Sequence, residues 1–163
     1  MISGPTEAAS VSEIKGRTHH GEMTVDQMAE AMPGMAVLMK EVGDRFTHTY
    51  YAAKGGNWKL AAYHLNQLRG AFRTAKTTRP KYSDDLSAFD RDYLLPIFQA
   101  IHARDWERFE AAFRKGEEGS DFYHDKKGVP HIRYQLPKDP PSNLYLGPPE
   151  KFKRESSGVG QQS

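Results

Sequence analysis

Residues 33–58 read PGMAVLMKEVGDRFTHTYYAAKGGNW and carry the strongest fold signal in the chain. Apolar side chains recur at three- and four-residue spacing, which is the period of one helix face. They are Met35, Met39, Val42, Phe46, Tyr50 and Ala53. Pro33 suits the first turn of a helix, where its missing N–H costs nothing. Gly55-Gly56 ends this helix near Lys54, and Asn57 can cap a second helix from Trp58.

The same reasoning predicts further helices. The second long helix covers residues 58–77, and a third covers residues 83–104. Pro96 lies within the third, so a kink or local break is expected there. Asp105 can cap a fourth helix over residues 106–127, and Thr24 can cap a short one over residues 25–32. The stripe of the second helix contains Ala61, Leu65, Leu68, Phe72 and Ala75.

Four amphipathic helices with short connections predict an all-α fold, an antiparallel four-helix bundle. Prolines at positions 130, 137, 140, 141, 148 and 149 forbid regular helix beyond the fourth helix. We therefore expect an extended, proline-rich C-terminal segment lying across the bundle. The expected organisation is a flexible N-terminal arm (1–23), a helical bundle domain (24–148) and a disordered tail (149–163).

Composition limits the function classes. The 163 residues are enough for one domain with its own core. Charge is nearly balanced, with 23 basic and 21 acidic residues, which argues against a dedicated nucleic-acid binder. Apolar runs are far too short to cross a membrane, and the first residues contain no signal-peptide core. The sequence contains no cysteine, which fits a reducing compartment, so we expect a cytoplasmic protein.

Three segments resemble small c-type cytochromes with a cytochrome c′-like bundle. They are residues 52–61 (AAKGGNWKLA), 120–124 (SDFYH) and 128–132 (GVPHI), the last followed by PPSN at 140–143. The resemblance implies a helical bundle that holds a ligand between its helices. It also implies haem on a Cys-x-x-Cys-His motif, but Ser120 and Tyr123 stand at the cysteine positions and only His124 carries over. Covalent haem is therefore excluded.

The chain also resembles haem-free bundle proteins of bacterial aromatic catabolism, among them lyases that release formaldehyde from phenylcoumaran-type, lignin-derived dimers. That resemblance implies a cofactor-free lyase acting on an aromatic substrate.

The fourth helix carries the main candidate site. Its inward face starts with Phe109 and Phe113, passes Gly116 and then turns polar without changing phase. The polar part consists of Ser120, Tyr123, His124 and Lys127. Buried polar groups cost a few kcal/mol each unless they are paired, so these residues predict partners or a wet cavity.

Polar residues also interrupt the apolar faces of the other helices. The candidates are Tyr50 and Tyr51 on the first helix, His64 and Arg69 on the second, Asp90 and Tyr93 on the third, and His131 beyond the fourth. We expect Tyr50 and Tyr51 to lie near His64, and Asp90 and Tyr93 to lie near His124. Each has a structural alternative: tyrosines as packed aromatics, Asp90 and His64 as surface or structural groups, and Ser120 as a spacer.

A histidine paired with an aspartate or tyrosine in a partly dry cavity suits proton transfer. The sequence predicts a cofactor-independent carbon–carbon lyase acting on a small aromatic molecule. His124 is the acid/base, Tyr51 and Arg69 complete the catalytic set, and the other candidates contact the substrate. The oligomeric state stays open, and a homodimer is one candidate, because bundles of this type often pair through helix faces.

Two alternatives stay open at this point. The first is a bundle that binds haem non-covalently through His124, or binds a metal. A di-iron site lacks its Glu-x-x-His pairs, and the nearest substitute is Asp121-x-x-His124; a zinc site could use His64 and His131. The second alternative is a protein that binds an aromatic ligand without changing it.

Overall fold

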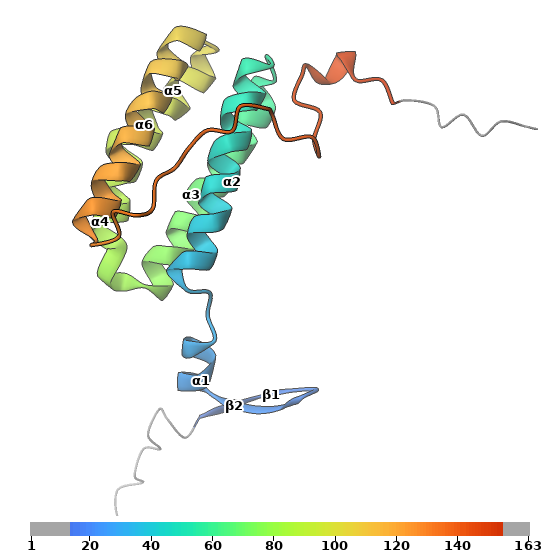
Figure 1. The fold of residues 1–163 in the computed structure, drawn as a ribbon. Coiled ribbons are helices and arrows are strands. Elements are labelled where there is room, and N and C mark those ends of the chain that lie inside the picture. The colour runs from blue at the N-terminus through green and yellow to red at the C-terminus, as the bar shows by residue number, and fades with distance from the viewer. Residues whose placement is uncertain (1–13, 155–163) are drawn as a thin grey trace, which may run out of the picture.

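The computed structural model describes residues 14–154, and most of this range is helical (Figure 1). The helical body comprises α2 (Met35–Lys54), α3 (Trp58–Thr78), α4 (Ser83–Phe89), α5 (Leu95–Ala103) and α6 (Trp106–Lys126). Contacts join α2 to α3, α3 to α5, α5 to α6 and α2 to α6. The all-α prediction holds for this body. No helix among residues 14–154 has the length and apolar content to cross a membrane.

Three helix starts have the side-chain caps that the sequence predicted. Asn57 Oδ1 accepts the Leu60 N–H at 3.1 Å, and Asp105 Oδ1 accepts the Arg108 N–H at 3.0 Å. Thr24 forms a capping box with Gln27 at the start of α1 (Val25–Glu30). Each such cap stabilises its helix by about 1 kcal/mol.

The expected break near Pro96 is a π-helical turn, η3 (Asp90–Leu94), between α4 and α5. Pro96 cannot donate the N–H that a regular helix would give to the Asp92 carbonyl. In the π-helical turn the Leu95 N–H donates to the Asp90 carbonyl five residues back, and α4, η3 and α5 follow one another as one helical run. Leu86, Ile97 and Ile101 stay buried on either side of the turn.

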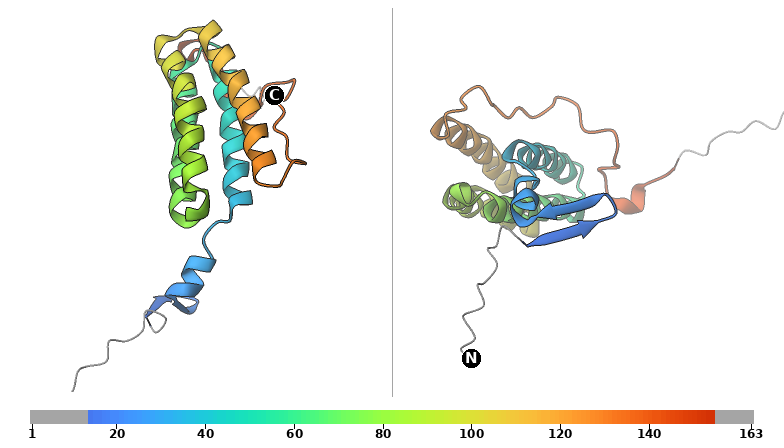
Figure 2. Two further views of the ribbon diagram at one scale, coloured as in Figure 1. Left: turned by 90° about the vertical axis from the view of Figure 1, so that its left-hand side faces the viewer. Right: turned by 90° about the horizontal axis from the view of Figure 1, so that it is seen from below.

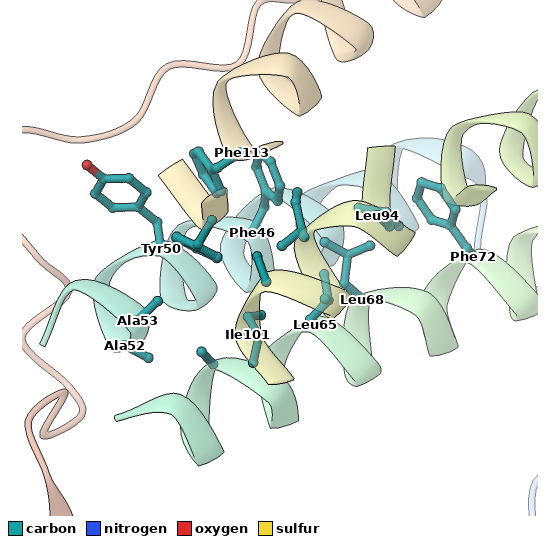
Figure 3. Close-up of a cluster of buried hydrophobic side chains, with 14 of the residues drawn as sticks. Phe46, Tyr50, Ala52, Ala53, Leu65, Leu68, Phe72, Leu94, Ile101 and Phe113 are labelled. Carbon is teal, nitrogen blue, oxygen red and sulfur yellow. The ribbon is translucent and has the colours of Figure 1, made fainter. Parts of the chain in front are cut away.

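The core lies between the helices and is built from the predicted stripes (Figure 3). All five stripe residues of α3 are buried, as are Phe109 and Phe113 of α6. On α2 the stripe divides. Phe46, Tyr50 and Ala53 are buried, whereas Met35, Met39 and Val42 are only half-buried at the edge of the core. This change along α2 marks where the interior stops being filled.

Part of the segment expected to be a flexible arm has secondary structure. Strands β1 (Lys15–Thr18) and β2 (Gly21–Thr24) form an antiparallel hairpin that leads into α1 (Figure 1). Gly21 has a φ of +136°, which glycine adopts readily, so it permits the tight turn between the strands. Residues 1–13 of the expected arm lie outside the described residues.

The C-terminal segment contains no helix or strand from Lys127 to Pro148 and runs over α2 (Figures 1 and 2). The Tyr51 hydroxyl donates to the Pro137 carbonyl, and Asn57 Nδ2 donates to the Gly147 carbonyl at 2.9 Å. A short 3-10 helix, η4 (Pro149–Lys151), lies within the range expected to be a disordered tail. Residues 155–163 of that tail are outside the described range.

Candidate functional site: a cavity beside His124

A cavity of about 510 Å³ lies where α2 begins and α6 ends. This volume falls within the range of small-molecule sites. Its apolar walls are Met35, Ala36, Met39, Val42, Gly43 and Phe46 of α2, Leu68 and Phe72 of α3, Leu86 and Phe89 of α4, Leu94 of η3, and Val129 and Ile132 of the C-terminal segment. Polar side chains enter mainly from α6 and the C-terminal segment. The cavity is therefore mostly apolar and has one polar side.

The polar face predicted on α6 lines this cavity as a unit. Ser120, Tyr123, His124 and Lys127 all contribute to the wall. Their three- and four-residue spacing continues the face that buries Phe109, Phe113 and Gly116. The face is thus one continuous surface that passes from the core into the cavity.

His124 is one of the polar residues in the cavity wall. Its Nδ1 is buried and has no hydrogen-bond partner within residues 14–154. Burial lowers the His124 pKa below the usual 6.5, and Arg133 adds to that effect, while Asp121 and the Ile132 backbone oppose it. The lowered pKa favours the neutral imidazole near pH 7, a form that can accept a proton.

Tyr134 of the C-terminal segment supplies a polar group that the sequence analysis missed. Its ring meets Phe46 edge-on, and its hydroxyl lies 2.9 Å from Thr47 Oγ1. Thr47 donates its own proton to the Gly43 carbonyl at 3.0 Å, so Tyr134 is the donor in their bond. Burial raises the pKa of Tyr134 to about 12, which keeps this donor protonated. Tyr134 lies in an irregular segment, where no helix or strand period indicates which side chains point inward, so the sequence carried no signal for it.

Charged groups ring the polar side. Lys127 forms an ion pair with Asp85 of α4, and Arg133 pairs with Asp125. Asp85, Tyr82 and Arg133 line the cavity and were also missed by the sequence analysis. Asp85 and Tyr82 lie at the start of the third helical run. They do not interrupt an apolar stripe there, and such interruptions were the signal used to find candidates.

Tyr50 and Tyr51, predicted to join the site, lie elsewhere. Tyr50 donates to Glu110 Oε1 at 3.0 Å, and burial and that carboxylate raise its pKa. The Tyr51 hydroxyl bonds the carbonyls of Pro137 and Lys138 in the C-terminal segment. Neither tyrosine lines the cavity.

Arg69 and Asp90 bind one another rather than a shared site with His124. The Arg69 guanidinium holds both Asp90 oxygens, at 2.7 and 3.0 Å, on a partly exposed surface between α3 and η3. Tyr93 packs against Gly119 and lines a separate hollow of about 310 Å³ between α5 and α6. His131 is exposed in the C-terminal segment.

His64 is buried between α2 and α3 instead of facing the cavity. Arg45 donates to its Nδ1 at 3.1 Å, and the His48 ring lies 4.8 Å away. Arginine can only donate, so neutral His64 carries its proton on Nε2, which is buried without a partner in the described part of the chain. Burial, with His48 and Arg45 nearby, lowers the His64 pKa to about 4.

The predicted metal ligands are not assembled. Within residues 14–154, no three histidine, aspartate or glutamate side chains come together as a metal-binding group. His64 and His131 lie outside the cavity that His124 lines.

Comparison of this chain with protein-family models, with curated proteins and with solved structures finds no match. The site therefore rests on the geometry of its own residues.

Proposed function

We propose that this protein is an antiparallel four-helix bundle that binds a small, mainly apolar aromatic molecule in the cavity, with His124 as its proton acceptor. The single observation that carries the proposal is the position of His124 on the polar side of a mostly apolar space of about 510 Å³. A hydrogen bond between a guest hydroxyl and the neutral imidazole would contribute about 1 kcal/mol.

The bundle assignment draws on the contact pattern. Contacts between α2 and α3, α3 and α5, α5 and α6, and α6 and α2 support a closed ring of four helical runs. The connections are short, as expected when successive helices run in opposite directions. In such a bundle, the end of α6 lies beside the start of α2, and the cavity sits between them.

The apolar walls favour an aromatic guest. Phe46, Phe72, Phe89 and Tyr123 contribute rings to the lining, and Met35 and Met39 add flexible thioether chains that adapt to ring edges. A hydroxyl on the guest could donate to the neutral imidazole of His124.

Proton acceptance by His124 also suits the carbon–carbon lyase reaction expected from the sequence. His124 would take the proton of a substrate hydroxyl, the adjacent carbon–carbon bond would break to give a carbonyl product, and the resulting carbanion would regain a proton. Tyr51 and Arg69 have no part in this proposal, because neither lines the cavity. Lys127, which lines the cavity, takes the charge-stabilising role that the sequence analysis gave to Arg69.

Binding is tested with 2-naphthol and naphthalene, which differ by one hydroxyl. We expect 2-naphthol to bind the parent about fivefold more tightly, the value of one hydrogen bond. His124→Leu should remove that preference while keeping the affinity for naphthalene. Gly43→Leu should abolish binding of both, because an added Cβ at Gly43 meets nothing within 4 Å and the longer side chain would enter the cavity. An unchanged preference in His124→Leu would refute the role of His124.

Two further measurements separate the alternatives. Formaldehyde release from a phenylcoumaran-type dimer, lost in His124→Gln, would support lyase chemistry, whereas binding without turnover would identify a carrier. A Soret band that appears after haem addition and is lost in His124→Gln would indicate that the ligand is non-covalent haem and not a small aromatic molecule.

A further inference from the structure

Two adjacent lysines share one carboxylate at the edge of the cavity. Lys126 Nζ lies 2.6 Å from Asp85 Oδ1, and Lys127 Nζ pairs with Asp85 Oδ2. Lysine hydrogen bonds lower the pKa of Asp85, so it is fully ionised at neutral pH. A single negative charge therefore faces two positive charges.

A third lysine joins them through Tyr82. Lys81 Nζ lies 5.0 Å from the centroid of the Tyr82 ring, and Lys127 Nζ lies 5.3 Å from the same centroid. Aromatic faces attract cations, so Tyr82 gathers two ammonium groups but does not neutralise them. We call Lys81, Lys126 and Lys127, with Tyr82 and Asp85, the lysine rim.

The lysine rim as a whole has an excess of positive charge, and its Lys127–Asp85 ion pair lines the cavity. Three ammonium groups and one carboxylate give a net charge of +2. Lys127, Asp85 and Tyr82 themselves line the cavity. On the neighbouring wall, Arg133 pairs with Asp125 and lies 3.9 Å from Asp121, so carboxylates balance its positive charge.

We infer that the ligand of the cavity is an aromatic acid, whose anionic group sits at the lysine rim while its ring lies among the apolar walls. This inference rests on the proposed function and specifies its ligand class. Lys127 is the primary contact, because it is the rim lysine that lines the cavity. An ion pair at a partly exposed site adds modest affinity and clear specificity against neutral analogues.

The test compares 1-anilinonaphthalene-8-sulfonate with N-phenyl-1-naphthylamine, which has the same ring system without the sulfonate. Fluorescence titrations would use the full chain. We expect the sulfonate to bind the parent about fivefold more tightly at low salt, and the preference to shrink in about 0.5 M added salt. Lys127→Met should bring the ratio of affinities close to one.

Lys59→Met is the matched control, because Lys59 is exposed at the start of α3 and loses the same charge away from the cavity. It should keep the preference for the sulfonate. Circular dichroism would verify that each variant is folded.

Equal affinities for the two probes in the parent, or a preference that survives Lys127→Met, would overturn the inference. Binding of the neutral amine to the parent but not to Gly43→Leu would still support the cavity as an aromatic site. Binding of neither probe would overturn both the inference and the proposed function.

Discussion

At the end of the helical body where α2 finishes and α6 begins, aromatic rings pack against one another, whereas at the opposite end they surround a space. In the filled end, Phe113 stacks on Phe46 at 4.0 Å and lies 4.8 Å from Tyr50, which meets Trp106 at 5.6 Å. In the hollow end, Phe89 lies 5.7 Å from Phe72 and 5.9 Å from Tyr123, but these rings also border the cavity.

The same helices and the same periodicity produce both ends, so periodicity alone does not decide between core and cavity. The difference comes from what completes the walls. Helix α6 closes the filled end with Phe109 and Phe113, but carries Ser120 and His124 into the hollow end. There the last wall is the C-terminal segment, which contributes Val129, Ile132 and Tyr134.

The largest difference between the two ends is expected on removing a ring. Phe113 is fully buried, so Phe113→Ala should lower the free energy of unfolding by about 3–5 kcal/mol. Phe89 is half-buried on the cavity wall, so Phe89→Ala should cost about 1–2 kcal/mol, because the ring already lacks neighbours on one side. Urea unfolding measures both. Equal losses would mean that the hollow end is as tightly packed as the filled end.

The next largest effect concerns buried His64 and half-buried His124, whose pKa values burial lowers. His64 has a folded-state pKa of about 4, below the usual 6.5, so the unfolded chain binds the proton more readily between these values. Stability should therefore fall as the pH drops from 6.5 to 4, by on the order of 3 kcal/mol. His64→Gln should flatten this dependence. The His124 pKa is also lowered, so His124→Gln should flatten it in the same direction. Chemical denaturation across that pH range tests both, and a loss that His64→Gln leaves intact would assign it to other groups.

Much of the fold could be predicted from the sequence because its signals are local. The caps at Asn57 and Asp105, the stripe of α3 and the break near Pro96 each depend on residues within a few turns. The hairpin before α1 was missed, because its short strands lack an alternating apolar pattern.

The site was harder to predict, because side-chain partners are set by tertiary packing. The face of α6 was readable, since one helix fixes the relative directions of Ser120, Tyr123 and His124. Whether Arg69 would reach a ligand or Asp90 depended on the rotation of α3 against η3. Tyr134 lies in an irregular segment, where no period shows which way a side chain points.

Glycine substitutions give a finer probe of the comparison. A Cβ at Gly119 would lie 2.5 Å from the Tyr93 ring, so Gly119→Ala should cost about 1–3 kcal/mol despite better helix propensity. A Cβ at Gly43 meets nothing within 4 Å, so Gly43→Ala should instead stabilise the protein by about 0.5–1 kcal/mol. Thermal unfolding of the two variants measures the signs. Destabilisation by Gly43→Ala would argue that the wall at this point is already closed.

The smallest effect concerns the attachment of the C-terminal segment. Tyr134→Phe removes the bond to Thr47 at the hollow end, and should cost about 1 kcal/mol. Tyr51→Phe removes the bonds to Pro137 and Lys138 at the filled end and serves as the matched change. Hydrogen exchange should show faster opening of residues 129–134 only in Tyr134→Phe. Equal opening in both variants would show that the segment detaches as one piece.

The central claim, that the hollow end takes an aromatic guest beside His124, is tested most directly by NMR of the protein with ¹⁵N-labelled histidines. During titration with 2-naphthol, the ring nitrogens of His124, assigned by their loss in His124→Gln, should shift, while those of His64 stay unchanged. In Gly43→Leu neither should move. Binding of 2-naphthol that leaves His124 unmoved, or that shifts His64 instead, would contradict the account.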